Sequence, residues 1–155
     1  MTSQPGGARS KRHIVVGVDG SESSKEALAW AIRQARLTGA EVLAVTAWAY
    51  PDEYGYPVIV PPIHWEKVAS RVVTSAISEV AAGTSNVAVR HEVVKGNAAH
   101  ALLAASAGAD LLVVGNRGHG GFVEALLGST GQHCVRHATC PVVVIRATKS
   151  RNRGD

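Results

Sequence analysis

This chain of 155 residues lacks long apolar runs and carries only two cysteines. No run approaches the roughly 20 apolar residues that cross a membrane, and the N-terminus is polar where a signal peptide would be apolar. We therefore expect a cytoplasmic protein with no membrane partner. Cys134 and Cys140 match neither a zinc nor a thioredoxin spacing, which favours reduced packing residues over a redox pair.

A basic surface spread over the fold is also missing, although the net charge is +4. Residues 1–12 and 146–155 contribute +3 each, so the body between them carries −2. Nucleic-acid-binding proteins usually spread their basic patch over the fold. We expect no nucleic-acid partner, and we divide the chain into a flexible basic tail at 1–12, one domain at 13–146 and a second flexible basic tail at 147–155.

The composition is that of a globular protein, with 46% hydrophobic and 18% charged residues. Short apolar runs alternate with helical patterns along the chain. Strands are predicted at 13–18, 41–48, 86–95, 110–114 and 141–145, with helices near 22–38, before Gly83, between Asn97 and Gly108, and near 129–138. This order predicts an α/β, Rossmann-like fold, with one five-stranded parallel sheet and helices on both faces.

Local signals set details of these segments. Ser23 with Glu26 predicts a capping box for the first helix, and Gly39 predicts its end. The predicted apolar stripe of the second helix is Val68, Val72, Val73, Ala76, Ile77 and Val80. The last strand is so apolar that an exposed edge there would invite pairing. We therefore expect a homodimer through residues 141–146.

A glycine-rich run, from Gly115 to Gly121, directly follows the fourth predicted strand. In an open parallel sheet, the carboxyl ends of the strands border the crevice where ligands bind. Glycines there let backbone N–H groups approach an oxygen-rich ligand. The segment from Gly128 to Thr130 then predicts a helix start, which favours anions. Together these features predict a phosphate-binding loop, and a glycine-rich turn without a ligand is the alternative.

Two common phosphate-binding motifs are excluded by spacing. A P-loop needs Lys and then Ser or Thr after its last glycine, whereas Ser129 follows Gly128 directly. A dinucleotide fingerprint needs a glycine where Val123 stands, and it belongs after the first strand. The spacing that remains is Gly115, two residues, Gly118, nine residues, and Gly128-Ser129.

This spacing resembles the nucleotide-binding signature of the universal stress protein family, in its ATP-binding branch. The resemblance covers about residues 13–146, and it also rests on the runs 15–21 and 140–144. It implies the strand order 3-2-1-4-5, in which the first and fourth strands are neighbours, and dimerisation through the last strand. Asp19 and the glycine loop would then flank one crevice.

The resemblance implies that this crevice holds ATP or another adenine nucleotide with Mg²⁺. Asp19 would accept hydrogen bonds from the nucleotide or help to hold Mg²⁺, and Arg117 would neutralise phosphate charge. The implied nucleotide-binding residues are Gly17, Val18, Asp19, Ala47, Val114, Gly115, Arg117, Gly118, Gly128, Ser129 and Thr130. Thr130 and Gly131 stand where many relatives have Val and then Thr or Ser, so one hydroxyl contact differs. Asp19 as a helix cap and Arg117 as a solvated side chain remain alternatives.

Three functions remain open at this point. The first is an ATP-binding regulatory stress-response protein, acting on an unknown protein partner with little or no hydrolysis. The second is a weak ATPase or phosphotransferase, which is disfavoured because no P-loop Lys is present and no carboxylate lies beside Arg117 and His119. The third is a scaffold that has lost its ligand. His133 and His137 have metal-ligand spacing, but surface or packing roles are favoured for them.

Overall fold

The computed structural model describes residues 11–50, 63–83, 86–117 and 127–147. Strands and helices alternate along it, as the sequence predicts. The strands are β1 (His13–Gly17), β2 (Glu41–Trp48), β3 (Val89–Lys95), β4 (Leu111–Gly115) and β5 (Val142–Ile145). The helices are α1 (Glu22–Thr38), α2 (Trp65–Val80), α3 (Ala98–Ser106) and α4 (Ser129–His137).

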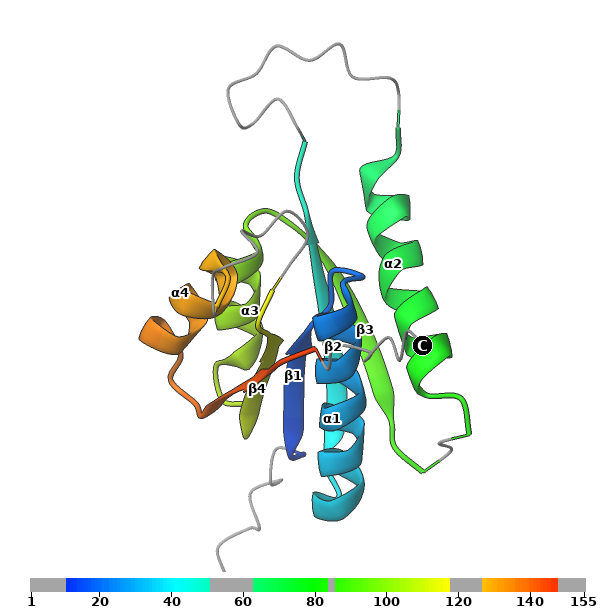
Figure 1. Ribbon diagram of the computed structural model, residues 1–155, viewed down its shortest axis with the longest axis vertical. Coiled ribbons are helices and arrows are strands. Elements are labelled where there is room, and N and C mark those ends of the chain that lie inside the picture. Colours follow the sequence, from blue (N-terminus) through cyan, green and yellow to red (C-terminus); the bar gives the residue numbers. More distant parts are fainter. Residues whose placement is uncertain (1–10, 51–62, 84–85, 118–126, 148–155) are drawn as a thin grey trace, which may run out of the picture.

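The five strands form one parallel sheet in the order β3-β2-β1-β4-β5 (Figure 1), which confirms the predicted topology. β1 pairs with β4, with Val15 opposite Leu112, and with β2, with Gly17 opposite Val45. The order of pairing reverses at β1, because β2 continues to one side of it and β4 to the other. The carboxyl ends of β1 and β4 are therefore the switch point, where open α/β sheets bind ligands.

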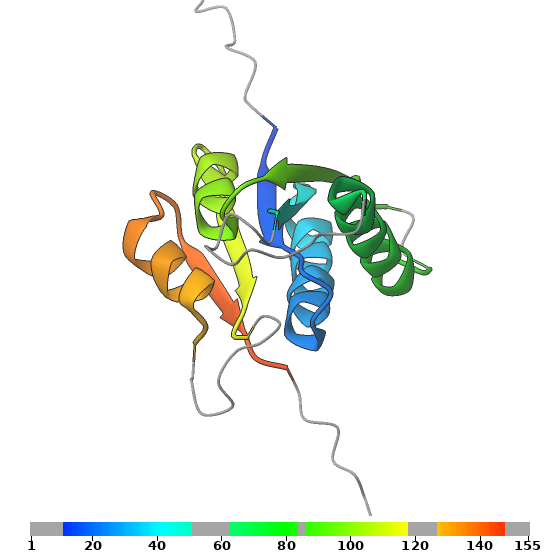
Figure 2. The ribbon, with the colours of Figure 1, turned by 90° about the horizontal axis from the view of Figure 1, so that it is seen from above.

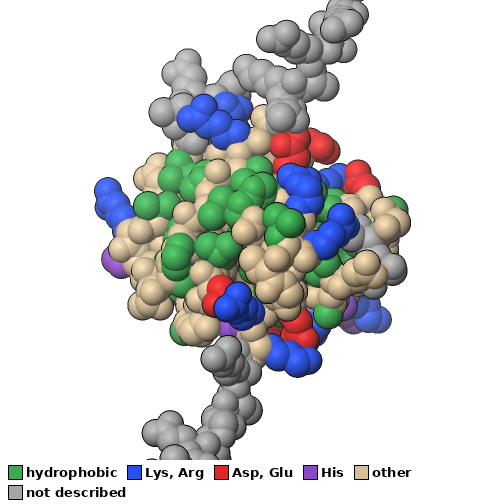
Figure 3. All heavy atoms as spheres, turned by 90° about the horizontal axis from the view of Figure 1, so that it is seen from below, with side chains coloured by type: hydrophobic (Ala, Val, Ile, Leu, Met, Phe, Trp, Pro, Cys, Tyr) green, Lys and Arg blue, Asp and Glu red, His purple; other side chains and the backbone are tan. Residues whose placement is uncertain are grey.

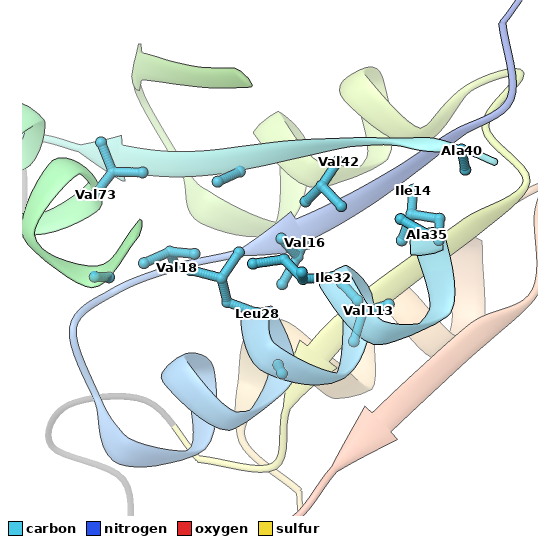
Figure 4. Close-up of a cluster of buried hydrophobic side chains, with 14 residues drawn as sticks. Ile14, Val16, Val18, Leu28, Ile32, Ala35, Ala40, Val42, Val73 and Val113 are labelled. Carbon is cyan, nitrogen blue, oxygen red and sulfur yellow. The ribbon is translucent and has the colours of Figure 1, made fainter. Parts of the chain in front are cut away.

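Two pairs of helices cover the sheet. α1 and α2 lie on one face, and α3 and α4 lie on the other (Figure 2). Alternate residues of β1 serve the two sides, since Ile14 and Val16 pack toward α1 while Val15 packs toward α3. Leu28 and Ile32 of α1 fill the first core (Figure 4). Both faces are apolar, so the central strands are buried on both sides.

The first helix has the predicted bounds, Glu22–Thr38, but its N-cap differs from the prediction. Its N-cap is Ser21, whose side chain accepts from the Ser24 N–H, and the predicted capping box of Ser23 and Glu26 is wrong. Ser23 lies inside the first turn and is buried. Its hydroxyl is engaged by Arg117 across the sheet end, a long-range contact that local pattern does not reveal. Gly39 ends the helix in the left-handed region, as predicted (φ 76°).

The second helix also departs from its predicted stripe. Val68 is 42% exposed, whereas its neighbour Ala69 is buried with Val73 and Ala76. Val68 is therefore not a core residue, because the buried face of the first turn is displaced by one residue from the face that the apolar pattern predicts. The proline-rich segment 51–62, Gly118, and almost all of the two predicted tails lie outside the described residues.

The surface carries charges of both signs. In the view from below, Lys and Arg side chains are interspersed with Asp and Glu around a group of hydrophobic side chains (Figure 3). Seen from this side, the Lys and Arg side chains of the described residues form no continuous patch. Among the described residues, the structure contains no helix that is both long and apolar enough to cross a membrane.

Candidate functional site

Two loops far apart in sequence meet at the switch point. The Ser23 hydroxyl donates to the carbonyl oxygen of Arg117 at 2.5 Å and accepts from the Arg117 N–H at 3.3 Å. Ser21 Oγ lies 3.2 Å from the same carbonyl oxygen. Since Ser23 is only 3% exposed, its two bonds form in a partly buried setting, where they are worth more than at the surface, whereas the Ser21 contact is exposed. They hold the loop after β4 against the start of α1.

The start of α4 is fixed to the same loop. The Gly128 N–H donates to the carbonyl oxygen of Asn116 at 2.8 Å, which brings Gly128, Ser129 and Thr130 beside the end of β4. Gly128 is the N-cap, and no side chain caps the helix. The first N–H groups of a helix have no partners within it, and its N-terminus carries partial positive charge. This end of α4 is suited to an anion.

Gly115 has a steric role at this junction. A Cβ on Gly115 would lie 2.5 Å from Ser23 Oγ and 2.7 Å from the Ser23 carbonyl carbon. The first turn of α1 therefore packs directly on the backbone at the end of β4, which only glycine permits. A Cβ on Gly131 would lie 2.5 Å from Leu127 Cδ1, but the end of a leucine side chain can move, so this position demands glycine less than position 115 does.

Asp19 lies on the loop between β1 and α1. Its carboxylate accepts hydrogen bonds from the Ser21 N–H at 2.9 Å and from the Ser21 hydroxyl. Asp19 thus stabilises the turn that leads into α1, although the N-cap of that helix is Ser21 rather than Asp19. Asp19 is exposed, and the hydroxyl of Ser21 links the β1–α1 loop to the carbonyl oxygen of Arg117. The carboxylate and the β4–α4 loop therefore share one edge of the sheet.

The other predicted site residues are divided between the two faces. Val18 is 3% exposed and packs in the core on the α1 side, and its N–H and C=O bond to Val45 and Thr46. Gly17 faces the opposite side, where a Cβ would lie 2.9 Å from Leu102 Cδ1. Val114 and Ala47 also belong to the core on the side of α3 and α4. The structure therefore gathers the backbone of these residues, rather than their side chains, at the strand ends.

A cavity of about 500 Å³ opens beside this junction, on the α1 side. Its lining comes from the first turn of α1 and from the residues that follow β4 and β5: Ser21, Glu22, Ser23, Asn116, Arg117, Arg146 and Ala147. Sequence reasoning missed Asn116 and Arg146 as site residues. The available signal was their position, because each directly follows the last residue of a parallel strand, at the edge where such sheets bind ligands.

Other candidate chemistry is weaker. His133 and His137 have ring centroids 4.5 Å apart, and His100 of α3 lies 5.7 Å from His133. The described ranges contain no cluster of three or more His, Cys, Asp or Glu side chains able to hold a metal. Cys134 and Cys140 are free thiols. Burial raises the pKa of the Cys134 thiol, and the nearby Cys140 raises it further, so Cys134 resists ionisation.

The fold and this edge define a doubly wound α/β protein with a candidate ligand site at its switch point. A model of the Universal stress protein family matches residues 11–146, and the chain belongs to that family. A universal stress protein of Mycobacterium tuberculosis is 35% identical over 133 residues, covering 86% of this chain and 44% of the relative. The chain thus spans less than half the length of that relative.

Two further proteins match this chain over nearly their whole length. A universal stress protein of Thermus aquaticus is 34% identical over 139 residues, covering 86% of this chain and 97% of the relative. A crystal structure described as a universal stress protein in complex with cAMP has a TM-score of 0.63 and 27% identity, covering 88% of this chain and 98% of the other. Each therefore resembles this chain over nearly a complete domain.

Proposed function

We propose that this chain is a regulatory protein that binds an adenine nucleotide at the carboxyl ends of β1 and β4, with ATP as the expected ligand. The observation that carries the proposal is the hydrogen bond from the Gly128 N–H to Asn116 O, at 2.8 Å. It brings an uncapped helix N-terminus beside the loop that contains Arg117. That combination of helix amides and a guanidinium group is suited to phosphate.

The comparisons support an adenine nucleotide as the ligand class. The solved structure with 27% identity is described as a complex with cAMP, and its likeness covers 88% of this chain. In this chain, Gly115, Gly128 and Ser129 are present at the spacing of the nucleotide signature. Ala47 and Val114, near the ends of β2 and β4, would back the base through their backbone, because their side chains belong to the core on the side of α3 and α4. Gly118 belongs to the proposed loop but lies outside the described residues.

Mg²⁺ would accompany the nucleotide rather than occupy a site of its own. Mg²⁺ usually binds through one or two carboxylates together with substrate phosphates. The carboxylate of Asp19 lies at the proposed edge, and that of Glu22 lines the cavity, so the oxygen donors fit the ion. We expect slow or absent hydrolysis, because no P-loop Lys is present and hydrolysis needs a positioned base and strong cationic help.

Calorimetric titration of nucleotide-free protein with ATP and Mg²⁺ tests the proposal. Wild type should bind, and Ser129→Ala with Thr130→Ala should weaken binding by about tenfold, as the loss of hydrogen bonds to a charged group predicts. Asp19→Asn tests the carboxylate while keeping its shape. Glu92→Gln, at an exposed position on β3, makes the same chemical change away from the site. If no heat is released with ATP, ADP, AMP or cAMP, the proposal fails and the scaffold that has lost its ligand becomes the favoured alternative.

A regulatory role further requires a protein partner that senses the bound state. We expect phosphate release from ATP to stay near the spontaneous rate, and a turnover well above it would favour the enzyme alternative. The stress signal and the partner belong to this proposal, and capture of partners with and without ATP would test them. A partner set that is unchanged by nucleotide would argue against nucleotide-dependent regulation.

A further inference from the structure

Two arginines that follow neighbouring strands lie beside one another at the cavity. The Asn116 N–H donates to the carbonyl oxygen of Ile145 at 2.8 Å, which joins the ends of β4 and β5. Arg117 follows Asn116 and Arg146 follows Ile145 in the sequence, and both arginines line the cavity. The backbone of Arg117 is also held by Ser23. The two cationic side chains therefore arise from fixed positions.

These two arginines form no ion pair within the described part of the chain. Glu22 also lines the cavity, but its carboxylate lies 3.6 Å from Lys25 and is 81% exposed. Two arginines that line one cavity with the first turn of α1 favour an anion, because the helix N-terminus adds partial positive charge. Their planar donor groups match phosphate oxygens.

Asn116 provides a second observation. The residue is 9% exposed, and its Oδ1 has no hydrogen-bond partner in the described ranges. Buried polar side chains in folded proteins are normally hydrogen-bonded. This oxygen is an acceptor, so a hydroxyl or amino group of a ligand would satisfy it and a phosphate oxygen would not. Asn116 also lies between the cavity and α4, since its carbonyl oxygen accepts from Gly128 while its N–H bonds to Ile145.

We propose that Arg146, with Arg117, binds the terminal phosphoryl groups of a nucleoside di- or triphosphate in this cavity. This inference rests on the proposed function and adds its selectivity. A phosphate at the start of α4 would lie on one side of Asn116, and the following phosphates would reach the arginines on the other. Arg146 is then the residue that distinguishes ATP and ADP from AMP, which has no phosphate to place there.

The test compares Arg146→Gln with Arg33→Gln, an equal loss of charge at an exposed position of α1 away from the cavity. Each full-length variant is titrated calorimetrically with AMP and with ATP·Mg²⁺. Arg146→Gln should weaken ATP binding by about tenfold or more, the effect of one lost charge-assisted contact, and leave AMP binding within about twofold. Arg146→Lys should recover part of the loss, because it restores the charge without the planar donors.

The outcomes separate this inference from the proposed function. Unchanged ATP binding in Arg146→Gln, or an equal loss for AMP and ATP, would overturn the role of Arg146 while the nucleotide site stands. If wild type binds neither nucleotide, the proposed function fails. Titration with inorganic pyrophosphate then tests separately whether the cavity binds phosphoryl groups. Pyrophosphate binding that is lost in Arg146→Gln would support a phosphoryl site, and no pyrophosphate binding to wild type would overturn it.

Discussion

The Ser23 side chain and the Arg117 backbone form a reciprocal pair of hydrogen bonds across the end of the sheet. The hydroxyl donates to the carbonyl oxygen at 2.5 Å and accepts from the N–H at 3.3 Å. One serine thus satisfies both backbone groups of a residue 94 positions away. Through this contact, the loop that is proposed to bind phosphate is positioned by the first helix rather than by β4 alone.

Ser23→Ala should therefore lower both stability and ligand affinity. Removing the hydroxyl leaves two backbone groups of Arg117 without this partner, and a buried unsatisfied group costs about 1–3 kcal/mol. Chemical denaturation should show a loss in that range, together with weaker ATP binding. Ser75→Ala, at an exposed position of α2, should change neither quantity. If Ser23→Ala matched the Ser75 control, the contact would have no structural role.

Gly115→Ala should be more damaging than Gly17→Ala, although both glycines end a central strand. The new methyl at 115 would meet Ser23 Oγ at 2.5 Å and the Ser23 backbone at 2.7 Å, whereas that at 17 meets only the end of the Leu102 side chain, at 2.9 Å. A leucine methyl can move, but a helix backbone cannot without shifting α1. We expect Gly115→Ala to cost about 1–3 kcal/mol or more in the free energy of unfolding. Equal costs for the two variants would contradict this explanation.

The order of elements was predictable because each strand and helix carries its own local signal. Apolar runs such as 41–48 match β2 to the residue, and Gly39 and Asn97 mark helix ends by their backbone and capping chemistry. The strand order itself does not follow from these patterns, since five strands allow several orders. It came from the family resemblance, and the observed pairing of β1 with β4 confirms it.

The candidate site was only partly predictable, because it depends on contacts between distant residues. Ser23 resembled a helix cap by its sequence neighbours, but it serves Arg117 instead. Val18 looked like a ligand-facing residue at a strand end, yet its side chain fills the α1 core. Arg146 resembled the first charge of a basic tail, although the pairing of β5 with β4 brings it to the cavity. In each case the missing information was tertiary.

Ionisation of Cys134 should lower the free energy of unfolding at alkaline pH. Burial raises the pKa of its thiol above the ordinary value of 9.0. Below pH 9 the thiol is protonated in both states, so its contribution is fully present. As the pH rises above 9, the unfolded thiol ionises while the folded one does not, and stability falls by at most about 1.4 kcal/mol per pH unit.

Comparing wild type with Cys134→Ala by denaturation between pH 8 and about 10.5 measures this term. The variant should be less stable throughout, because a cavity is left in the core, but its stability should fall less steeply above pH 9. In native protein, Cys140, which is partly exposed, should react with a thiol reagent before Cys134, which is fully buried. Parallel curves and equal labelling rates would be inconsistent with a buried, protonated Cys134.

The two edges of the sheet differ in the way that the expected dimer requires. On β3, Arg90, His91 and Glu92 are exposed, and charged side chains discourage pairing between edges. β5 is apolar throughout, and Val144 is 37% exposed. Wild type at micromolar concentration should therefore sediment as a dimer, and Val144→Lys should sediment as a monomer. Val68→Lys is the matched control, because Val68 is also an exposed valine, at 42%, but lies on α2. A monomeric wild type, or equal effects of the two lysines, would remove β5 as the dimer interface.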